Sequence, residues 1–384
     1  YVMAGIYIHI PFCLQKCNYC NFYSESDILL KNKLINTLLT EIKLRASYLN
    51  NETVRTIYFG GGTPSLLLPN EIQQMIDAVF SLFQLSDEIE ITLEANPNNL
   101  TEEYIKQLSA TAINRLSIGI QSFYDNDLQT LGRIHTAKQA EESILLAQKY
   151  HFNNLSIDLM YGFPGLTLEK WKSNLNKIKN IEHISCYQLT LEKKSLLYQK
   201  IKNGILLSTP EDEIIEQYHY LISFAKKHHF IHYETSNFCQ ENFESKHNTS
   251  YWQDALYLGI GPSAHSYNKE SRQWNISDNK AYITFFENLL SLEDYDLKGE
   301  NVVFEKEILT TDMRFNEYIM TSLRTIWGCS LDYIQQHFGK SYLKHLRQQL
   351  SNIQPDFYIL SPSSLRLTEK GNLFADYIAA SLFV

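Results

Sequence analysis

The stretch Ile6-Tyr-Ile-His-Ile10, followed at once by Cys13-Leu-Gln-Lys-Cys17-Asn-Tyr-Cys20, decides how this 384-residue chain begins to fold. The first segment is short, apolar and rich in isoleucine, which predicts a buried strand. Three cysteines then stand within eight residues, one thiolate fewer than the usual four-cysteine iron–sulfur or zinc site provides. A [4Fe-4S] cluster held by these three thiolates would keep one iron open to a small molecule. The alternative is a structural zinc site that borrows a distant fourth ligand.

Composition and charge narrow the class of protein. Hydrophobic residues make up 44% of the chain and charged residues 20%, which is ordinary for a folded protein. The net charge of −9 argues against non-specific binding to a nucleic-acid backbone. We find neither a signal peptide nor a run of about eighteen apolar residues. Closely spaced thiols without a secretory signal predict a reducing compartment, by default a bacterial-type cytoplasm.

Short strand-like runs alternate with longer amphipathic stretches over the first 190 residues. This alternation predicts βα units around a parallel sheet, either a full or partial barrel or a doubly wound sheet. The expected strands are Ile6–Ile10, Thr53–Phe59, Ile89–Glu94, Asn114–Ile118, Leu155–Met160 and His183–Leu189.

Polar residues and glycines follow these strands one after another. The second strand leads into Gly60-Gly61-Gly62-Thr63-Pro64, and the third ends on Glu94. Glycines let a backbone approach a ligand closely, and a carboxylate can accept hydrogen bonds from ribose hydroxyls. Arg133 could pair bidentately with a ligand carboxylate. The alternatives are a capping or salt-bridged Glu94 and a solvated surface arginine. Because the carboxyl ends of parallel strands form the ligand-binding face of a barrel, we expect these groups to converge.

The remainder of the chain is less regular. Residues 247–267 read as a loop dense in His, Tyr, Trp and Gly. From about Glu305, three helices and two short strands around Ser361-Pro-Ser-Ser364 resemble a winged-helix fold. Because the chain is acidic, we favour packing or partner docking over DNA binding for this unit. Three further cysteines stand singly, and we expect them to be inert thiols: Cys186, Cys239 and Cys329.

Five ordered motifs resemble one family closely. They are Tyr7-Ile-His-Ile-Pro-Phe-Cys13, Phe59-Gly-Gly-Gly-Thr-Pro-Ser65, Ile118-Gly-Ile-Gln-Ser-Phe123, Leu131-Gly-Arg-Ile-His135 and Asp158-Leu-Met-Tyr-Gly-Phe-Pro164. With the C-x3-C-x2-C spacing, the chain resembles the radical S-adenosylmethionine (SAM) proteins related to oxygen-independent coproporphyrinogen III oxidase. The resemblance runs from Tyr7 to about Tyr267, and residues 305–384 fit the family's C-terminal domain.

The resemblance implies an α/β fold: a partial (β/α)6 TIM-type barrel with a smaller, C-terminal winged-helix-like domain. It divides the chain into a barrel over residues 1–240, a His- and aromatic-rich extension and linker over 241–300, and the C-terminal domain over 301–384. It places a [4Fe-4S] cluster on Cys13, Cys17 and Cys20. The SAM contacts that it implies are Tyr7, Gly61, Gly62, Thr63, Glu94, Gln121, Arg133, Asp158 and Gln188.

One position departs from the oxidases. They carry a fourth cysteine two residues after the third, where this chain has Phe22. Downstream, His247-Asn248-Thr-Ser-Tyr251-Trp252 resembles the H-N-x-x-Y-W motif of the HemW branch, whose members are regarded as heme-binding chaperones. The imidazole of His247 could ligate heme iron while Tyr251 and Trp252 pack on the porphyrin. The alternative is a histidine that is hydrogen-bonded within the protein. Further candidate ligands are His228, His229, His232 and His265.

The favoured hypothesis is a heme-binding chaperone with a SAM-coordinated cluster, which delivers heme to acceptor proteins. One alternative is an oxidase-like enzyme that decarboxylates porphyrinogen propionates, an activity that Phe22 makes doubtful. A third is a radical SAM enzyme acting on RNA through the C-terminal unit. The favoured hypothesis implies two partners, heme and a heme-acceptor protein. We expect a monomer or a dimer without stable nucleic-acid binding. Transient association with a membrane is compatible with this hypothesis.

Overall fold

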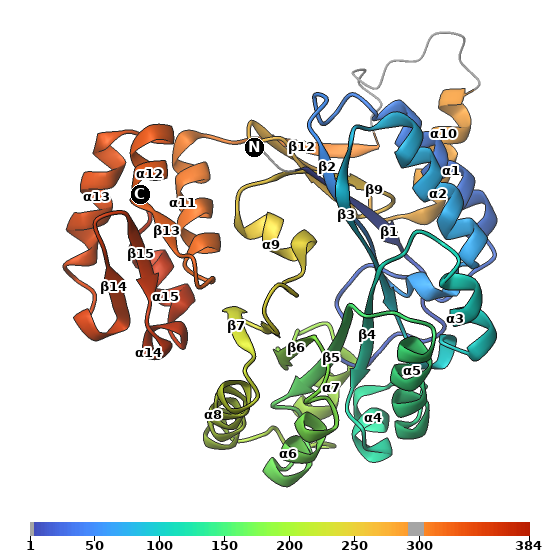
Figure 1. Cartoon of the computed structure of the whole chain (residues 1–384), viewed down its shortest axis with the longest axis horizontal. Coiled ribbons are helices and arrows are strands. Elements are labelled where there is room, and N and C mark those ends of the chain that lie inside the picture. Colours follow the sequence, from blue (N-terminus) through green and yellow to red (C-terminus); the bar gives the residue numbers. More distant parts are fainter. Residues whose placement is uncertain (1–3, 291–302) are drawn as a thin grey trace.

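The computed structural model describes residues 4–290 and 303–384 (Figure 1). Each of the six expected strands overlaps one strand of a single large sheet, and each pairs in parallel with the next along the chain. These strands are Ala4–Ile10 (β1), Val54–Gly61 (β2), Leu85–Ala95 (β3), Arg115–Gln121 (β4), Leu155–Tyr161 (β5) and His183–Gln188 (β6).

Helices cover the outer face of this parallel sheet (Figure 1). Ile6, Ile8 and Ile10 of β1 are almost fully buried in the core that the helices close. Threonines fix several helix starts, because their side chains accept a hydrogen bond from a backbone N–H of the first turn. The helices are Lys31–Leu44 (α1), Pro69–Leu82 (α2), Glu102–Leu108 (α3), Asp125–Leu131 (α4), Ala137–Lys149 (α5) and Leu168–Lys177 (α6). Short 3-10 turns lie at Pro64–Leu66, Pro97–Asn99 and Pro355–Phe357.

The sheet does not close into a full barrel, because its two edge strands do not pair with each other in the described part of the chain. Its order is β12-β11-β10-β9-β1-β2-β3-β4-β5-β6-β8-β7, so β1 to β6 form an uninterrupted parallel arc. The arc is the partial barrel that the sequence predicts. The added elements are Leu196–Lys202 (α7), Glu211–Lys227 (α8), Ile231–Glu234 (β7), Asn237–Cys239 (β8), Lys246–Trp252 (α9), Leu256–Ile260 (β9), His265–Tyr267 (β10), Ser271–Asn275 (β11), Asn279–Leu290 (α10) and Phe304–Ile308 (β12).

The prediction of a loop over residues 247–267 is wrong. Ser245 caps α9 by accepting a hydrogen bond from the backbone N–H of Asn248, and β9 then pairs in parallel with β1. The apolar residues of β9 are buried in the main core. Tertiary pairing with β1 therefore overrides the polar and aromatic composition of this stretch.

A second hydrophobic core lies in the C-terminal part, drawn in orange and red in Figure 1. A three-stranded sheet of order β13-β15-β14 packs beside the helices in a winged-helix-like arrangement. The sequence predicts β14 and β15, and the short strand β13 is added to them. Its elements are Thr311–Ser322 (α11), Cys329–Ser330 (β13), Leu331–His337 (α12), Lys340–Leu350 (α13), Tyr358–Leu360 (β14), Ser364–Leu367 (β15), Glu369–Asn372 (α14) and Ala375–Ser381 (α15). The predicted boundary at residue 300 lies outside the described residues, and the one at residue 240 stays a prediction.

Across residues 4–290 and 303–384, every helix falls short of the length or apolarity that a membrane span requires.

Candidate functional site

The loop after β1 brings the three clustered cysteines to the carboxyl end of the parallel strands. Cys13, Cys17 and Cys20 are partly buried, and all three line one cavity of about 500 Å³, which we call the cysteine cavity. The loop is anchored across the barrel, because Asn18 donates from its backbone to Leu131 O (2.9 Å) and from its side chain to Thr130 O (2.8 Å). The other three cysteines are buried away from it, and burial raises the pKa of Cys239 to about 12.

Two hydrogen-bond donors face the sulfurs. The Thr63 hydroxyl lies 3.4 Å from Cys13 Sγ, and a guanidinium nitrogen of Arg133 lies 3.4 Å from Cys17 Sγ. Both contacts place a hydrogen-bond donor beside a sulfur, and donors of this kind are typical of the surroundings of metal-bound cysteine. Within the described residues no three His, Cys, Asp or Glu side chains converge on a single metal ion. A [4Fe-4S] cubane binds each cysteine through a different iron, so it suits thiols that stand around a cavity.

The triple glycine holds the turn after β2 against the cysteine loop. Gly62 donates its backbone N–H to Ile10 O (2.8 Å), and a Cβ on it would stand 2.5 Å from Phe12 O. Gly61 has φ +106°, and a Cβ there would meet the His9 ring at 2.5 Å. Only glycine fits both positions. The glycines thus place Thr63 beside Cys13.

Two carboxylates lie in the cysteine cavity at the ends of β3 and β5. Glu94 accepts hydrogen bonds from the Tyr58 hydroxyl (2.8 Å) and the Gly61 N–H (3.2 Å). Asp158 accepts one from the Ser117 hydroxyl (3.1 Å). Burial raises the pKa of Glu94 to about 7 and that of Asp158 to about 6. Both carboxyl groups accept hydrogen bonds from neutral hydroxyls in the protein, and ribose hydroxyls are donors of the same kind.

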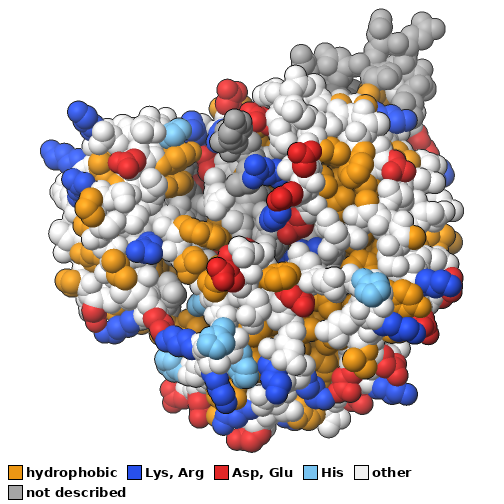
Figure 2. All heavy atoms as spheres, in the orientation of Figure 1, with side chains coloured by type: hydrophobic (Ala, Val, Ile, Leu, Met, Phe, Trp, Pro, Cys, Tyr) orange, Lys and Arg blue, Asp and Glu red, His pale blue; other side chains and the backbone are white. Residues whose placement is uncertain are grey.

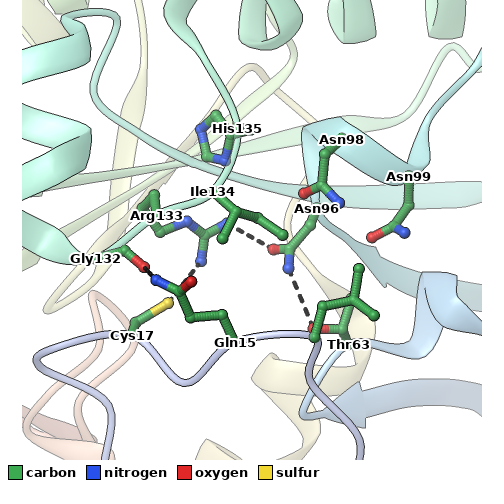
Figure 3. Close-up of a pocket in the computed structure, with 11 residues that line it drawn as sticks. Gln15, Cys17, Thr63, Asn96, Asn98, Asn99, Gly132, Arg133, Ile134 and His135 are labelled. Carbon is green, nitrogen blue, oxygen red and sulfur yellow. Dashed lines mark hydrogen bonds between the residues drawn. The ribbon is translucent and has the colours of Figure 1, made fainter. Parts of the chain in front are cut away.

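Arg133 connects the cysteine loop with the end of β3 (Figure 3). Its second terminal nitrogen donates to Asn96 Oδ1 (2.6 Å) and to Gly119 O (2.5 Å). Asn96 in turn donates to the Thr63 hydroxyl (3.1 Å), and Gln15 donates to Gly132 O (3.1 Å). Arg133 is therefore a fixed cation at the cavity rather than a solvated surface side chain. Asn96 is a site residue that our sequence analysis did not single out, although it stands two positions after Glu94.

The structure brings together eight of the nine predicted SAM residues. They line the cysteine cavity: Gly61, Gly62, Thr63, Glu94, Gln121, Arg133, Asp158 and Gln188. Gln121 has φ +70°, a strained backbone of the kind that gathers at functional sites. The ninth, Tyr7, is absent from that lining. Its hydroxyl bonds His9 Nδ1 (3.0 Å), and it lines a second cavity of about 510 Å³, which we call the aromatic cavity.

The predicted heme residues divide between the core and the aromatic cavity. Tyr251 and Trp252 line the cavity. His247 is 1% exposed and absent from its lining. Its Nδ1 lies 2.7 Å from the Thr56 hydroxyl and its Nε2 lies 2.8 Å from the Tyr251 hydroxyl. Burial lowers the pKa of His247 to about 3, so the ring is neutral and both nitrogens are occupied within the protein.

Phe22 is shared by the two cavities. Its side chain is 70% exposed and lines both the cysteine cavity and the aromatic cavity. The residue at the position of the oxidases' fourth cysteine thus stands where the two spaces meet.

Comparisons with known proteins agree with this geometry. Residues 7–178 match the family model of the radical SAM superfamily. The heme chaperone HemW of Bacillus subtilis is 31% identical over 98% of both chains, and that of Haemophilus influenzae is 33% identical over 96% of this chain and 95% of the other. The structure of coproporphyrinogen III oxidase (HemN) from Escherichia coli, a radical SAM enzyme, superposes with a TM-score of 0.83, at 20% identity over 100% of this chain and 90% of that one. The fold is therefore that of this oxidase, and the chain belongs to the HemW heme chaperone family of radical SAM proteins.

Proposed function

We propose that this protein binds heme and passes it to an acceptor protein, and that its barrel holds a [4Fe-4S] cluster and SAM. The observation that carries the proposal is an aromatic cavity of about 510 Å³ next to the cysteine cavity, with Phe22 in the lining of both. A volume of this size is ordinary for a small-molecule site. Aromatic walls suit a flat, apolar tetrapyrrole. Full-length similarity to curated heme chaperones supports the same conclusion.

The residues of the cysteine cavity fit the cluster and SAM. Three thiols with adjacent donors would hold the cluster, which leaves one iron for SAM. Glu94 has the acceptor character for a ribose diol, and Arg133 is the fixed cation that a SAM carboxylate needs. We assign SAM contacts also to the other predicted residues that line the cysteine cavity: Gly61, Gly62, Thr63, Gln121, Asp158 and Gln188. When bound, the pair supplies one-electron chemistry. The protein's part is to hold both groups and exclude water.

An oxidase-like enzyme is the second candidate, because the cysteine cavity keeps every predicted SAM residue except Tyr7. Such an enzyme would decarboxylate porphyrinogen propionates. The aromatic cavity and Phe22 favour the heme carrier instead. An RNA-directed enzyme is disfavoured, because residues 305–384 carry eight Lys or Arg and eight Asp or Glu. Figure 2 shows Lys and Arg interspersed with Asp and Glu on the face that it displays. A continuous basic footprint, which nucleic-acid binding needs, is absent from that face.

Two parallel assays distinguish a heme carrier from an oxidase-like enzyme. The full-length protein with reconstituted cluster is titrated with hemin, and the same preparation receives coproporphyrinogen III, SAM and a reductant under anaerobic conditions. We expect saturable hemin binding at micromolar concentration and no decarboxylated product. Product formation without hemin binding would replace the carrier by the enzyme. We place this activity in the cytoplasm, where closely spaced thiols stay reduced.

A further inference from the structure

The aromatic cavity lies between the barrel and the C-terminal domain. The strands β1 and β9 to β11, helix α9 and the residues that follow Cys20 supply one part of its lining, and α11 supplies the other. Eight of its eighteen lining residues are Phe, Tyr or Trp, which is far above the 13% of the whole chain. Trp252 in this lining has a buried indole N–H without an acceptor among the described residues. The cavity therefore has the walls of a site for a flat aromatic ligand.

His265 is a histidine of this lining whose ring nitrogens are available to bind a metal. It is exposed, and across residues 4–290 and 303–384 neither ring nitrogen has a hydrogen-bond partner. Strand alternation on β10 explains its direction. Ser266 faces the core, where Arg45 bonds it (3.4 Å), so His265 and Tyr267 lie on the opposite face, toward the cavity. Partial burial and the neighbouring Arg272 lower the pKa of His265, so the ring is neutral near pH 7 and able to bind iron.

His247 differs from His265 in its burial, its position relative to the cavity and its hydrogen bonds. It is buried, it is absent from the cavity lining, and both of its nitrogens are bonded, to Thr56 and Tyr251. Its ring also stacks on Tyr58 with centroids 4.9 Å apart. Ligation through either nitrogen of His247 would break the buried hydrogen bond that this nitrogen makes and leave its partner unsatisfied, at a cost of about 1–3 kcal/mol. Its geometry is that of a residue that positions Tyr251 at the cavity wall.

Among the described residues that line the cavity, Arg314 is the cation without an ion-pair partner. Arg272 of β11 is bound bidentately by Glu317 of α11, at 2.7 and 2.9 Å. Asp254 accepts from the hydroxyls of Tyr267 (2.5 Å) and Tyr333 (2.6 Å). Arg314 of α11 has no carboxylate within salt-bridge distance in the described part of the chain, and it packs over the Phe338 ring at 5.9 Å. It is therefore available to a carboxylate of the ligand.

We propose that the aromatic cavity is the heme site, with His265 as the iron ligand and Arg314 as the partner of one propionate. This assignment rests on the proposed function. It adds where heme binds, which residue ligates the iron and which cation pairs with a propionate. Because the lining comes from both domains, heme would be bound at their interface. Phe22 then separates heme from the cluster and SAM.

The test compares variants of the full-length, reconstituted protein in hemin titrations followed by the Soret band. His265→Ala should lose the histidine-ligated spectrum and weaken binding at least about ten-fold, since even changes outside the first coordination sphere cost that much. Added imidazole should restore the spectrum in His265→Ala, which a merely structural defect would not allow. His219→Ala, on the exposed face of α8, is the matched control and should bind as the wild type does.

Two further variants complete the test. His247→Ala should keep the spectrum, and Arg314→Gln should weaken binding about three-fold at low salt, the range of an exposed ion pair. The assignment is overturned if His265→Ala binds hemin with the wild-type spectrum and affinity, or if only His247→Ala abolishes them. Both of those outcomes leave the proposed function intact. Absence of hemin binding by the wild-type protein would instead remove the proposed function and the assignment together.

Discussion

Glu94 illustrates how single residues prepare the cysteine cavity. Its carboxylate is held by one hydroxyl and one backbone N–H, and these two bonds only partly offset its burial. Its pKa rises from the ordinary 4.5 to about 7. Between these pH values the folded state binds more protons than the unfolded state. The free energy of unfolding of the apo-protein therefore falls as pH rises through this window.

The direction of this pH dependence gives a prediction for the variant Glu94→Gln. Relative to wild type, the variant should gain stability as pH rises from 4.5 to 7.5, by up to about 3 kcal/mol for the full shift. Denaturant unfolding at several pH values measures the difference, with Glu103→Gln on the exposed face of α3 as control. Parallel pH profiles for wild type and Glu94→Gln would contradict the raised pKa. The same substitution should weaken SAM binding, since a ribose acceptor is lost.

The cysteines give the second residue-scale prediction. Cys17→Ser removes one of the three thiols of the cysteine cavity, and we expect its iron content and visible cluster absorption after reconstitution to fall to near background. Cys239→Ala removes a buried thiol elsewhere and should retain both. Iron analysis and absorption spectra measure the effect. Equal cluster loading in the two variants would contradict the assignment of the cluster.

Spacing along the chain predicts some site residues and cannot predict others. The cysteines and strand-end groups follow from the order of the βα units, which is why eight predicted SAM residues share one cavity. Asn96 escapes prediction because its role depends on Arg133, 37 positions away. The hydrogen bond between His247 and Thr56 cannot be predicted from the sequence either, since the two residues lie 191 positions apart. Contacts of this kind exist only once the strands pair.

At the scale of elements, the turn after β2 sets the position of the cysteine loop. A Cβ at Gly62 would stand 2.5 Å from Phe12 O and 2.9 Å from Ile10 O, and neither backbone atom can move without displacing the loop. Gly62→Ala should therefore reduce cluster reconstitution several-fold. Gly165→Ala is the control, because its Cβ meets open space at φ +88° and adds only backbone strain of about 1–2 kcal/mol. Equal reconstitution in both variants would show that the loop does not depend on this turn.

The sequence predicts best those elements in which apolar residues recur at a regular period. Several of the six parallel strands carry core residues at alternate positions, as in Ile6-Tyr-Ile-His-Ile10 and Leu155-Ser-Ile-Asp-Leu159. In the stretch after Ser245, the helix and strands depend on a cap and on pairing with β1. Its aromatic residues read as loop composition in the sequence, whereas in the structure many of them line the aromatic cavity.

At the scale of the whole molecule, the bridge between Arg272 and Glu317 joins the large sheet to the C-terminal domain. Their side chains are 31% and 25% exposed, so we expect a coupling free energy of about 1 kcal/mol or less. A double-mutant cycle with Arg272→Gln and Glu317→Gln measures it by denaturant unfolding. The more exposed pair Lys370 and Asp356, within the C-terminal domain, should couple more weakly. Zero coupling for the first pair would show that it does not hold the domains together.

Hemin titration of the full-length, cluster-reconstituted protein tests the heme-carrier proposal most directly. Absorption at the Soret band gives both stoichiometry and affinity. We predict one hemin per chain at saturation, with half-saturation at micromolar concentration, because in the described part of the chain the aromatic cavity has His265, without a hydrogen-bond partner, in its lining. A Soret band that rises linearly without saturation, as it does for free hemin, would contradict heme carriage by this protein.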